Sequence, residues 1–419
     1  MSATGPARLL CLDPGADVTR RDVYSRMRER GVEVVLLNRV LRPWERGQVD
    51  RWIEGDPTDP AVALEAARRA APLAGVLNCS ESCLEAAAAV AEGLELPGPR
   101  PALARLCRDK LLMAERLPAA GVPQALRSVV TRAGELGAAA ARVGFPCVLK
   151  PSTGVASIYT VRCETLGELE RWFRRFSADV RAHAPAPLRR MEDRWIVEEY
   201  LDGPAFSVES LVVDGRVSHL ATCRKGSVAP PFFREVGHSS PAGIDRQAER
   251  ELHDLTDRTV AALEIDHCVT HAEFKVTRDG PRLLEIGARM GGGSIRQVVR
   301  LATGIDLLEL TLDLALGRTP EPRPRHRGAA ASRSLFPARA GRVAGLDPAA
   351  LLALPGIVAV NAWMRPGDVY HLPPRGLREV LGVVACGRDP EQAIRRAESA
   401  IVNAEAAGAA RLVPLEAVA

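Results

Sequence analysis

The chain has 419 residues, 47% of them hydrophobic, and its 56 basic and 52 acidic side chains give a net charge of +4. This length predicts two or three domains around a large core, and the small net charge excludes a strongly basic nucleic-acid-binding protein. No apolar run approaches the ~18 residues of a membrane span, and the run before Asp13 is too short for a signal peptide. The nine scattered cysteines include one i, i+4 pair, Cys79 and Cys83, which we interpret as reduced thiols. We therefore expect a cytoplasmic protein with no membrane or nucleic-acid partner.

Lysine is rare in this chain. Only four of the 56 basic residues are lysines, and the other 52 are arginines, a skew typical of GC-rich coding. A lysine that persists against this bias is a candidate for a place where a compact, flexible ammonium matters. Because the sample is only four, lysine scarcity favours a functional role for each of them only slightly. The four are Lys110, Lys150, Lys225 and Lys275.

The first hundred residues alternate between strand and helix patterns. This alternation predicts a parallel sheet covered by helices, a Rossmann-like α/β domain over residues 1–100. No GxGxxG follows the first strand, so we expect the domain to support a site rather than carry its own cofactor. The expected strands are 7–13, 32–38 and 74–80, and the expected helices are 17–31, 65–73 and 81–94.

Residues 101–320 form the expected central region. Its first part, 102–145, is mainly helical, and 145–163 is typical of strand, loop and strand. Residues 177–193 are rich in proline, alanine and charge and are expected to be a mobile insertion. Strands turned at Asp-Gly follow over 194–226, and then a further strand pair and a long helix that reaches about Leu316.

A C-terminal, β-rich lobe is expected over residues 321–419. The proline- and arginine-rich segment 317–328 precedes it as a linker. Strands are expected around 332–338 and 356–364, followed by an alanine-rich helix over 391–408.

Two glutamates are expected to face each other across a β-hairpin in segment 271–294. We expect a three-residue loop, 278–280, with glycine in its left-handed position. This loop places Glu273 opposite Glu285, with Cβ atoms roughly 4.5–5.5 Å apart. A two-residue Asp-Gly turn would shift the register by one residue and separate the pair.

Facing carboxylates repel each other unless a cation lies between them. Oxygen ligands suit Mg²⁺, which usually takes one or two protein carboxylates together with nucleotide phosphates. Arg289 continues the same face of the strand as Glu285 and so points toward the same place. The alternative interpretation is a solvated hairpin with exposed charges.

A second candidate site is the segment VLKPSTGVAS, residues 148–157. A lysine at the end of a buried strand, followed by a loop of small residues, can cover phosphates with backbone N–H groups. The chain has no GxxxxGK[ST] motif, so this is not a Walker loop, and an ordinary β-turn explains the segment equally well.

Four segments in this order, 108–123, 148–157, 195–203 and 271–294, resemble the ATP-grasp superfamily, and the likeness covers most of the chain. The resemblance implies a mixed α/β and α+β fold in which two lobes clamp ATP behind the N-terminal α/β domain. By the same resemblance, Lys110 and Lys150 contact the ATP phosphates, and the loop residues that cover these phosphates are Ser152, Thr153, Gly154 and Ser157.

The resemblance also implies how adenosine is held. Glu198, in the segment VEEYL, would bind the exocyclic amine, while backbone groups around Glu199 and Leu201 would read the edge of the ring. Many family members have a further glutamate that binds ribose, but the matching position here is Ala205. Glu209 could substitute for it.

For the metal, the resemblance assigns Glu273 and Glu285 to Mg²⁺, with Mn²⁺ as an acceptable replacement. Arg289 matches the arginine that holds the acyl-phosphate and the transition state. Many members have asparagine two residues after the second metal glutamate, whereas this chain has Gly287, so one usual metal ligand is missing.

Segment 224–244, with its Gly-His and Pro-Ala pairs, and segments 285–295 and 300–317 resemble the L-amino-acid, or dipeptide, ligase branch of carboxylate–amine ligases. His238 would touch substrate or phosphate, unless it is an exposed loop histidine. Phe232 and Phe233 are candidates for an amino-acid pocket or for plain core. Arg296 and Arg300 are candidates for holding a substrate carboxylate, although a solvated helix face suits Arg300 better.

This branch implies an ADP-forming carbon–nitrogen ligase. A carboxylate attacks the γ-phosphorus of ATP, and an amine then attacks the resulting acyl-phosphate. The expected partners are small-molecule carboxylate and amine substrates, with the protein as a homodimer. The alternatives are a biotin-carboxylase-like or purine-pathway carboxylation enzyme of the same superfamily, and a nucleotide-binding regulator without turnover.

Overall fold

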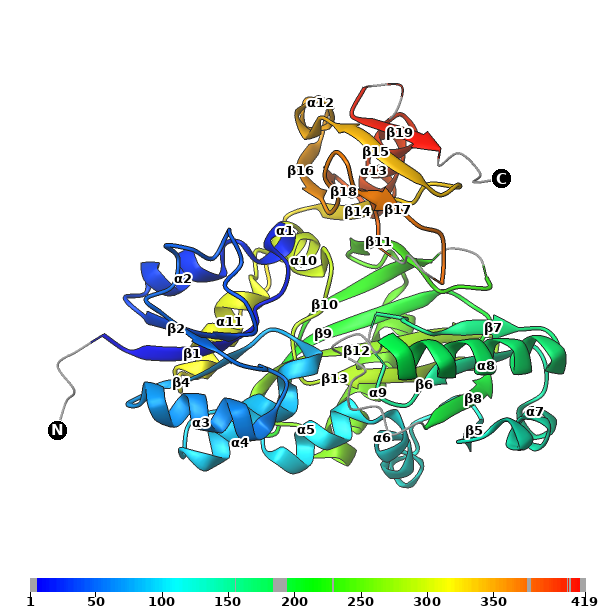
Figure 1. Ribbon diagram of the computed structural model, residues 1–419, viewed down its shortest axis with the longest axis horizontal. Helices are drawn as coiled ribbons and strands as arrows, with labels where there is room; N and C mark the ends of the chain where they lie inside the picture. Colours follow the sequence, from blue (N-terminus) through cyan, green and yellow to red (C-terminus); the bar gives the residue numbers. More distant parts are fainter. Residues whose placement is uncertain are drawn as a thin grey trace.

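The computed structural model describes residues 6–154, 156–183, 194–227, 230–374, 378–404, 406 and 408–414. Figure 1 shows an N-terminal lobe on the left, a long central sheet, a small lobe on the right and a C-terminal lobe above them. Within these residues no helix is long and apolar enough to cross a membrane.

The N-terminal lobe is the parallel sheet that the sequence predicts. Its strands β1 (Arg8–Leu12), β2 (Glu33–Asn38), β3 (Arg51–Glu54) and β4 (Gly75–Asn78) lie in the order β3-β2-β1-β4. The short edge strand β3 was not expected. Helices α3 (Pro60–Ala70) and α4 (Leu84–Gly93) are present, but the helix expected over 17–31 is broken into α1 (Asp17–Arg20) and α2 (Val23–Glu29).

Helices from far along the chain complete this lobe. α3 and α4 cover one face of the sheet, and the other face packs on α2, α10 (Ile295–Thr303) and α11 (Leu307–Ala315). The single long helix expected before Leu316 is therefore two helices. Gly304, with φ of +78°, ends α10, and the Asp306 side chain caps α11 by accepting a hydrogen bond from the Leu308 N–H.

The central sheet has eight strands and crosses the expected boundary at residue 320. β14 pairs with β11, so strands of the C-terminal lobe continue the sheet that begins at β13. Helix α9 (Arg246–Leu263) packs on one face, against Phe206 and Phe274 among others. In sheet order the strands are β13 (Gly280–Gly287), β12 (Cys268–Thr277), β9 (Ala205–Val213), β10 (Arg216–Ser227), β11 (Glu235–Ser240), β14 (Ala329–Leu335), β18 (Leu381–Gly387) and β16 (Ile357–Ala362).

The small lobe is a four-stranded antiparallel sheet backed by α7 (Leu136–Val143) and α8 (Leu166–His183). The insertion expected over 177–193 is wrong in its first part, because residues 177–183 end α8 and bury Ser177 and Val180. Residues 184–193 lie outside the described residues. The strand order is β5 (Arg127–Val130), β8 (Trp195–Glu199), β6 (Cys147–Pro151) and β7 (Val161–Cys163), so β5 is a strand inside a segment expected to be mainly helical.

The remaining elements join and finish these lobes. α5 (Pro101–Arg108) and α6 (Lys110–Arg116) connect the N-terminal lobe to the small lobe, and residues 318–328 contain no helix or strand, as a linker predicts. The C-terminal lobe adds a separate three-stranded sheet of β17 (Val369–Tyr370), β15 (Gly341–Leu346) and β19 (Ala410–Pro414), with helices α12 (Pro348–Leu352) and α13 (Pro390–Val402).

Candidate active site

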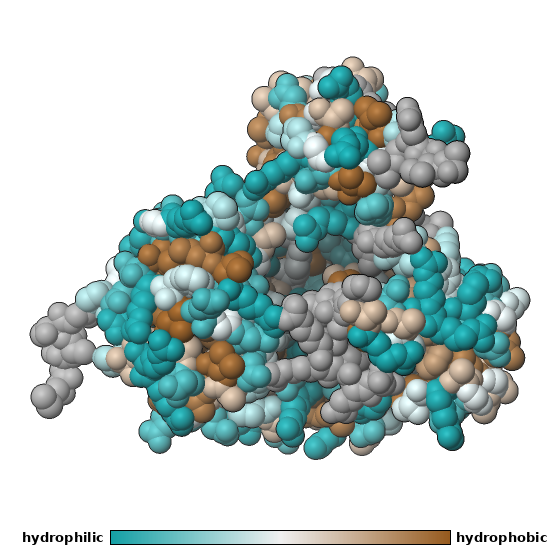
Figure 2. Space-filling model, viewed as in Figure 1, coloured by the Kyte–Doolittle hydropathy of each residue, from teal (hydrophilic) through white to brown (hydrophobic). Residues whose placement is uncertain are grey.

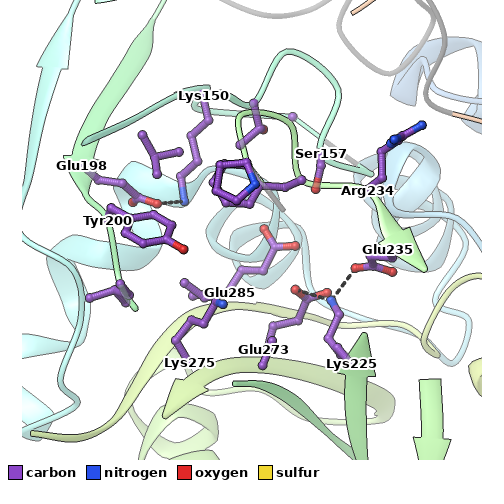
Figure 3. Close-up of a pocket in the computed structure, with 18 of the residues that line it drawn as sticks. Lys150, Ser157, Glu198, Tyr200, Lys225, Arg234, Glu235, Glu273, Lys275 and Glu285 are labelled. Carbon is purple, nitrogen blue, oxygen red and sulfur yellow. Dashed lines mark ion pairs between the residues drawn. The ribbon is translucent and has the colours of Figure 1, made fainter. Parts of the chain in front are cut away.

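A cavity of about 510 Å³ lies between the small lobe and the central sheet. β6 and β8 line one side of it, and β10, β12 and β13 line the other (Figure 3). Its volume is in the range of small-molecule sites, and the space-filling view shows a hollow between the lobes (Figure 2).

All four lysines of the chain line this cavity. They come from four separate elements, α6, β6, β10 and β12, so only the fold brings them together. In a chain with 52 arginines, this convergence supports the interpretation that lysine persists where an ammonium is needed.

Three of these lysines form ion pairs with glutamates of the cavity. Lys110 Nζ lies 2.8 Å from Glu285 and Lys150 Nζ lies 2.5 Å from Glu198. Lys225 bridges two carboxylates, as its Nζ lies 2.5 Å from Glu235 and 2.7 Å from Glu273 (Figure 3). Lys275 instead donates to the Gly203 carbonyl at 2.7 Å.

Glu273 and Glu285 lie opposite each other across β12 and β13, as the sequence predicts, but the loop was predicted wrongly. The loop has two residues, because Thr277 pairs with Gly280. A β-bulge at Leu284 adds one residue to β13 and restores the glutamate pairing. The interpretation as a solvated hairpin is also wrong, since both carboxylates line the cavity.

Neighbouring cations keep both glutamates ionised. Burial opposes ionisation, but Lys225 and His271 hold the pKa of Glu273 well below its usual range. The Glu285 side chain is 30% exposed, and Lys110 lowers its pKa even though partial burial and the nearby Glu273 act against this. Two ionised carboxylates fit Mg²⁺ shared with phosphates. The described residues contain no group of three or more His, Cys, Asp or Glu that would hold a metal without such added ligands.

The loop after β6 lies over the same cavity. Gly154 and Ser157 line it, and the Gly154 carbonyl accepts a hydrogen bond from Lys110 Nζ at 3.0 Å. Ser152 and Thr153 do not line the cavity; their buried hydroxyls have no hydrogen-bond partner within the described part of the chain. Ser157 has a φ of +55°, a conformation that non-glycine residues adopt rarely.

The end of β8 lines another part of the cavity. The Glu199 side chain accepts a hydrogen bond from the Leu126 N–H at 3.2 Å, which fixes it against β5. Glu198, Tyr200 and Leu201 line the cavity with it. The Tyr200 ring is itself held by the Arg162 guanidinium, whose central carbon lies 4.2 Å from the ring centroid.

Comparisons with known proteins agree with this arrangement. A model of the ATP-grasp domain matches residues 143–297, which include Lys150, Glu198 and both glutamates of the β12–β13 hairpin. The chain contains an ATP-grasp domain. A model of the L-amino acid ligase C-terminal domain 2 matches residues 333–403 of this ATP-grasp chain.

Individual proteins are similar over different lengths. An uncharacterized protein of Sinorhizobium fredii, y4rH, is 30% identical over 298 residues, 70% of this chain and 60% of that protein. Alanine–anticapsin ligase of Bacillus subtilis is 26% identical over 237 residues, 53% of this chain and 50% of the ligase. The crystal structure of L-amino acid ligase from Bacillus licheniformis superposes with a TM-score of 0.83 at 21% identity, covering 99% of this chain and 100% of the other. The ATP-grasp chain thus spans about half the length of the curated relatives and has the fold of the solved ligase.

Besides Ser152 and Thr153, three more residues expected in the ATP-grasp site lie outside the cavity. Arg289 Nε lies 2.8 Å from the carboxylate of Glu81, in the short 3₁₀ turn before α4. Glu209 is fully buried and bonds His271 Nδ1 at 2.6 Å, so the ribose role suggested for it has no support from its position. His238 is a buried residue of β11, and its interpretation as an exposed loop histidine is wrong.

The Gly287 departure from the ATP-grasp pattern has a local explanation. A Cβ at this position would lie 2.8 Å from the Glu81 carboxylate that pairs with Arg289. A side chain at residue 287 therefore competes with this ion pair for the same space.

The two arginines suggested as carboxylate ligands do not lie in the cavity. Arg296 is buried and bonds Asp22 and Asp306, and Arg300 is exposed on α10. Of the two phenylalanines, Phe233 lines the cavity, whereas Phe232 packs against Trp172 in the small lobe with ring centroids 5.3 Å apart.

Sequence reasoning missed several residues of this site. Glu235 and Tyr200 line the cavity, and Glu81 reaches Arg289 from the N-terminal lobe. The scarcity of lysine could have pointed to Lys225 and Lys275 as site residues. Lys275 also lies on the same face of β12 as Glu273. No feature of the local sequence distinguishes Glu81 from other glutamates at the start of a helix.

Proposed function

We propose that this chain is an ATP-dependent carboxylate–amine ligase that joins amino acids, or an amino-acid-like acid and amine, and releases ADP and phosphate. The observation that carries the proposal is the convergence of all four lysines on the cavity that holds the facing pair Glu273 and Glu285. The L-amino acid ligase C-terminal domain favours amide formation over carboxylation.

ATP would lie along the cavity, with its adenine against the end of β8. Backbone groups around Glu199 and Leu201 would read the ring edge, although the Glu199 N–H itself donates to the Leu126 carbonyl at 2.8 Å. Lys150 holds Glu198 in place beside the exocyclic amine. The phosphates would then extend toward Lys110 and Gly154 at the other end.

Glu273 and Glu285 would hold Mg²⁺ together with the phosphates, with Mn²⁺ as a replacement. The bound ion supplies charge neutralisation at the phosphoryl oxygens. In the structure Lys110 and Lys225 form ion pairs with these carboxylates. Both lysine side chains are flexible and can turn toward the phosphates when ATP binds.

Phosphoryl transfer needs positioning and positive charge more than covalent chemistry. The lysines would align the terminal phosphate with the attacking carboxylate, and Arg289 would stabilise the charge that develops on the transferred group. The amine then attacks the acyl carbon, and phosphate leaves with the bonding electron pair. His238 would contact substrate or phosphate after a change of position.

The amino-acid class of the substrates is supported by the names of similar ligases. Alanine–anticapsin ligase and the L-arginine-specific L-amino acid ligase of Bacillus subtilis are 26% and 23% identical to this chain. The two substrates of this chain, its expected cytoplasmic location and its expected homodimer remain part of the proposal. Light scattering tests the dimer.

The decisive experiment is a phosphate-release screen over pairs of amino acids, with mass detection of the product and phosphorus NMR of the nucleotide. We expect one amide, one ADP and one phosphate per turnover. Stoichiometric AMP would overturn the mechanism, and ATP hydrolysis that depends on bicarbonate rather than on an amine would favour a carboxylation enzyme.

The metal assignment has its own test. Glu273→Gln and Glu285→Gln should each lower turnover at least ~100-fold and raise the Mg²⁺ requirement, because each removes one ionised oxygen ligand. Glu391→Gln is a matched control on α13, where the side chain is 83% exposed. Wild-type rates in either cavity variant at moderate Mg²⁺ would contradict the assignment.

A further inference from the structure

Arg20 is a buried arginine that forms no ion pair with any acidic residue that the structure describes. It ends α1 in the N-terminal lobe and is 5% exposed. Its only hydrogen bond within the described residues goes to the neighbouring Thr19 carbonyl, at 3.3 Å. Arg296, buried to the same extent, instead bonds two carboxylates. Burying a guanidinium without a counter-ion costs free energy of folding, so a buried guanidinium that has none is a candidate for binding an anionic ligand.

The place of Arg20 in the fold is one where ligands bind. The parallel sheet has the order β3-β2-β1-β4, so the direction of chain progression reverses between β1 and β4. In open α/β sheets, ligands occupy the crevice at the carboxyl ends of the strands at such a reversal. Arg20 follows the carboxyl end of β1, and Cys79 follows that of β4.

The surroundings of Arg20 favour an anion. Burial lowers the pKa of Arg20, and the nearby cations Arg296 and Arg289 lower it further, while Cys79 and the Asp22 carboxylate oppose the shift. Arg296 is neutralised by Asp22 and Asp306, and Arg289 by Glu81. Within the described part of the chain, Arg20 is thus the arginine of this group that has no ion pair of its own.

We propose that Arg20 binds the free carboxylate of the amine substrate, which is therefore an α-amino acid rather than a simple amine. The assignment rests on the proposed ligase function. The carboxylate of the acyl substrate is consumed at the phosphate, whereas that of the amine substrate persists through the reaction and needs its own partner. A planar guanidinium suits a carboxylate through two parallel hydrogen bonds.

Binding can be measured without turnover. Thermal unfolding of the wild type with ADP would be compared in the presence of a pool of the L-amino acids and of the same pool as α-carboxamides. We expect the free acids to raise Tm and the amides to have little effect. In Arg20→Met the response to the acids should be lost, with affinity falling about ten- to one-hundred-fold, the usual size for a charged hydrogen bond.

Stability of the unliganded protein separates this role from a structural one. Because the free guanidinium has no ion pair among the described residues, Arg20→Met should leave Tm without ligand unchanged or higher. Arg21→Met is the matched control one residue further on, where the side chain is 75% exposed and pairs with Asp17; it should behave as wild type in both measurements.

Several results would overturn the proposal: an Arg20→Met protein that is destabilised or does not fold, an unchanged response of that variant to the acids, equal stabilisation of the wild type by amides, or no stabilisation by the acids. Arg20-dependent protection by inorganic phosphate alone would assign the site to phosphate and overturn the carboxylate. Because the assay needs no catalysis, these outcomes are distinct from failure of the phosphate-release screen.

Discussion

Arg296→Met removes an ion-pair connection between the N-terminal lobe and α10. The Arg296 guanidinium donates two hydrogen bonds to Asp306, at 2.5 and 2.8 Å, and two to Asp22, at 2.7 and 2.6 Å. Methionine keeps much of the apolar stem but leaves Asp306 without its cation and Asp22 with only Arg26, whose Nε lies 3.9 Å away.

The two carboxylates differ in burial, and this difference sets the magnitude. The Asp306 side chain is 9% exposed, so leaving it unpaired should cost about 3–5 kcal/mol. The Asp22 side chain is 41% exposed, and a solvated pair contributes only about 0–1 kcal/mol. We therefore expect Arg296→Met to lower the free energy of unfolding by about 4 kcal/mol and Asp22→Asn by about 1 kcal/mol.

Urea unfolding followed by circular dichroism measures both variants. Arg300→Met is the control, since Arg300 lies one turn further along α10 and is exposed; it should change stability by less than about 0.5 kcal/mol. An Arg296→Met protein of wild-type stability that loses affinity for an amino-acid substrate would refute this reasoning. That result would restore Arg296 as a substrate ligand.

Lys150→Ala should weaken ATP binding, whereas Arg289→Ala should mainly slow the chemical step, because the arginine gains strength as charge develops. Calorimetry with a non-hydrolysable ATP analogue separates them, and equal losses of affinity would count against the division. Gly287→Asn and Glu81→Gln should both lower turnover, because a Cβ at residue 287 would lie 2.8 Å from the Glu81 carboxylate that pairs with Arg289. Wild-type kinetics in both variants would show that this carboxylate is dispensable. Burial and a stacked neighbouring imidazole lower the pKa of His219 to about 4, below its value near 6.5 in the unfolded chain. The free energy of unfolding should therefore be highest above pH ~6.5 and fall by up to about 3 kcal/mol as the pH drops toward 4. In His219→Gln, Tm should depend less on pH between 6.5 and 4.

Local patterns were sufficient for much of the fold. The alternation of β12 identified Glu273 and its polar face, and the strand–loop–strand pattern located Lys150 and its loop. Elements without a strong local period were missed or misjudged. β3 has four residues, and α10 and α11 were taken as one helix because Gly304 interrupts a continuous hydrophobic pattern only briefly.

The glutamate pairing shows how a correct prediction can follow from a wrong premise. Loop length alone would have separated Glu273 from Glu285, and a bulge at Leu284 restores their register. A bulge satisfies packing and hydrogen bonding across neighbouring strands, so its position depends on the whole sheet rather than on the hairpin sequence.

The sequence by itself determined which side chains are unusual: four lysines among 52 arginines, and two glutamates in a hairpin. Only the tertiary structure decided their partners. Lys225 joins Glu235 to Glu273, Glu81 reaches Arg289 from another lobe, and Arg20 has no ion pair among the described residues. The reason is that ion pairing depends on distances of a few ångströms between elements remote in the chain, which local propensity and periodicity do not encode.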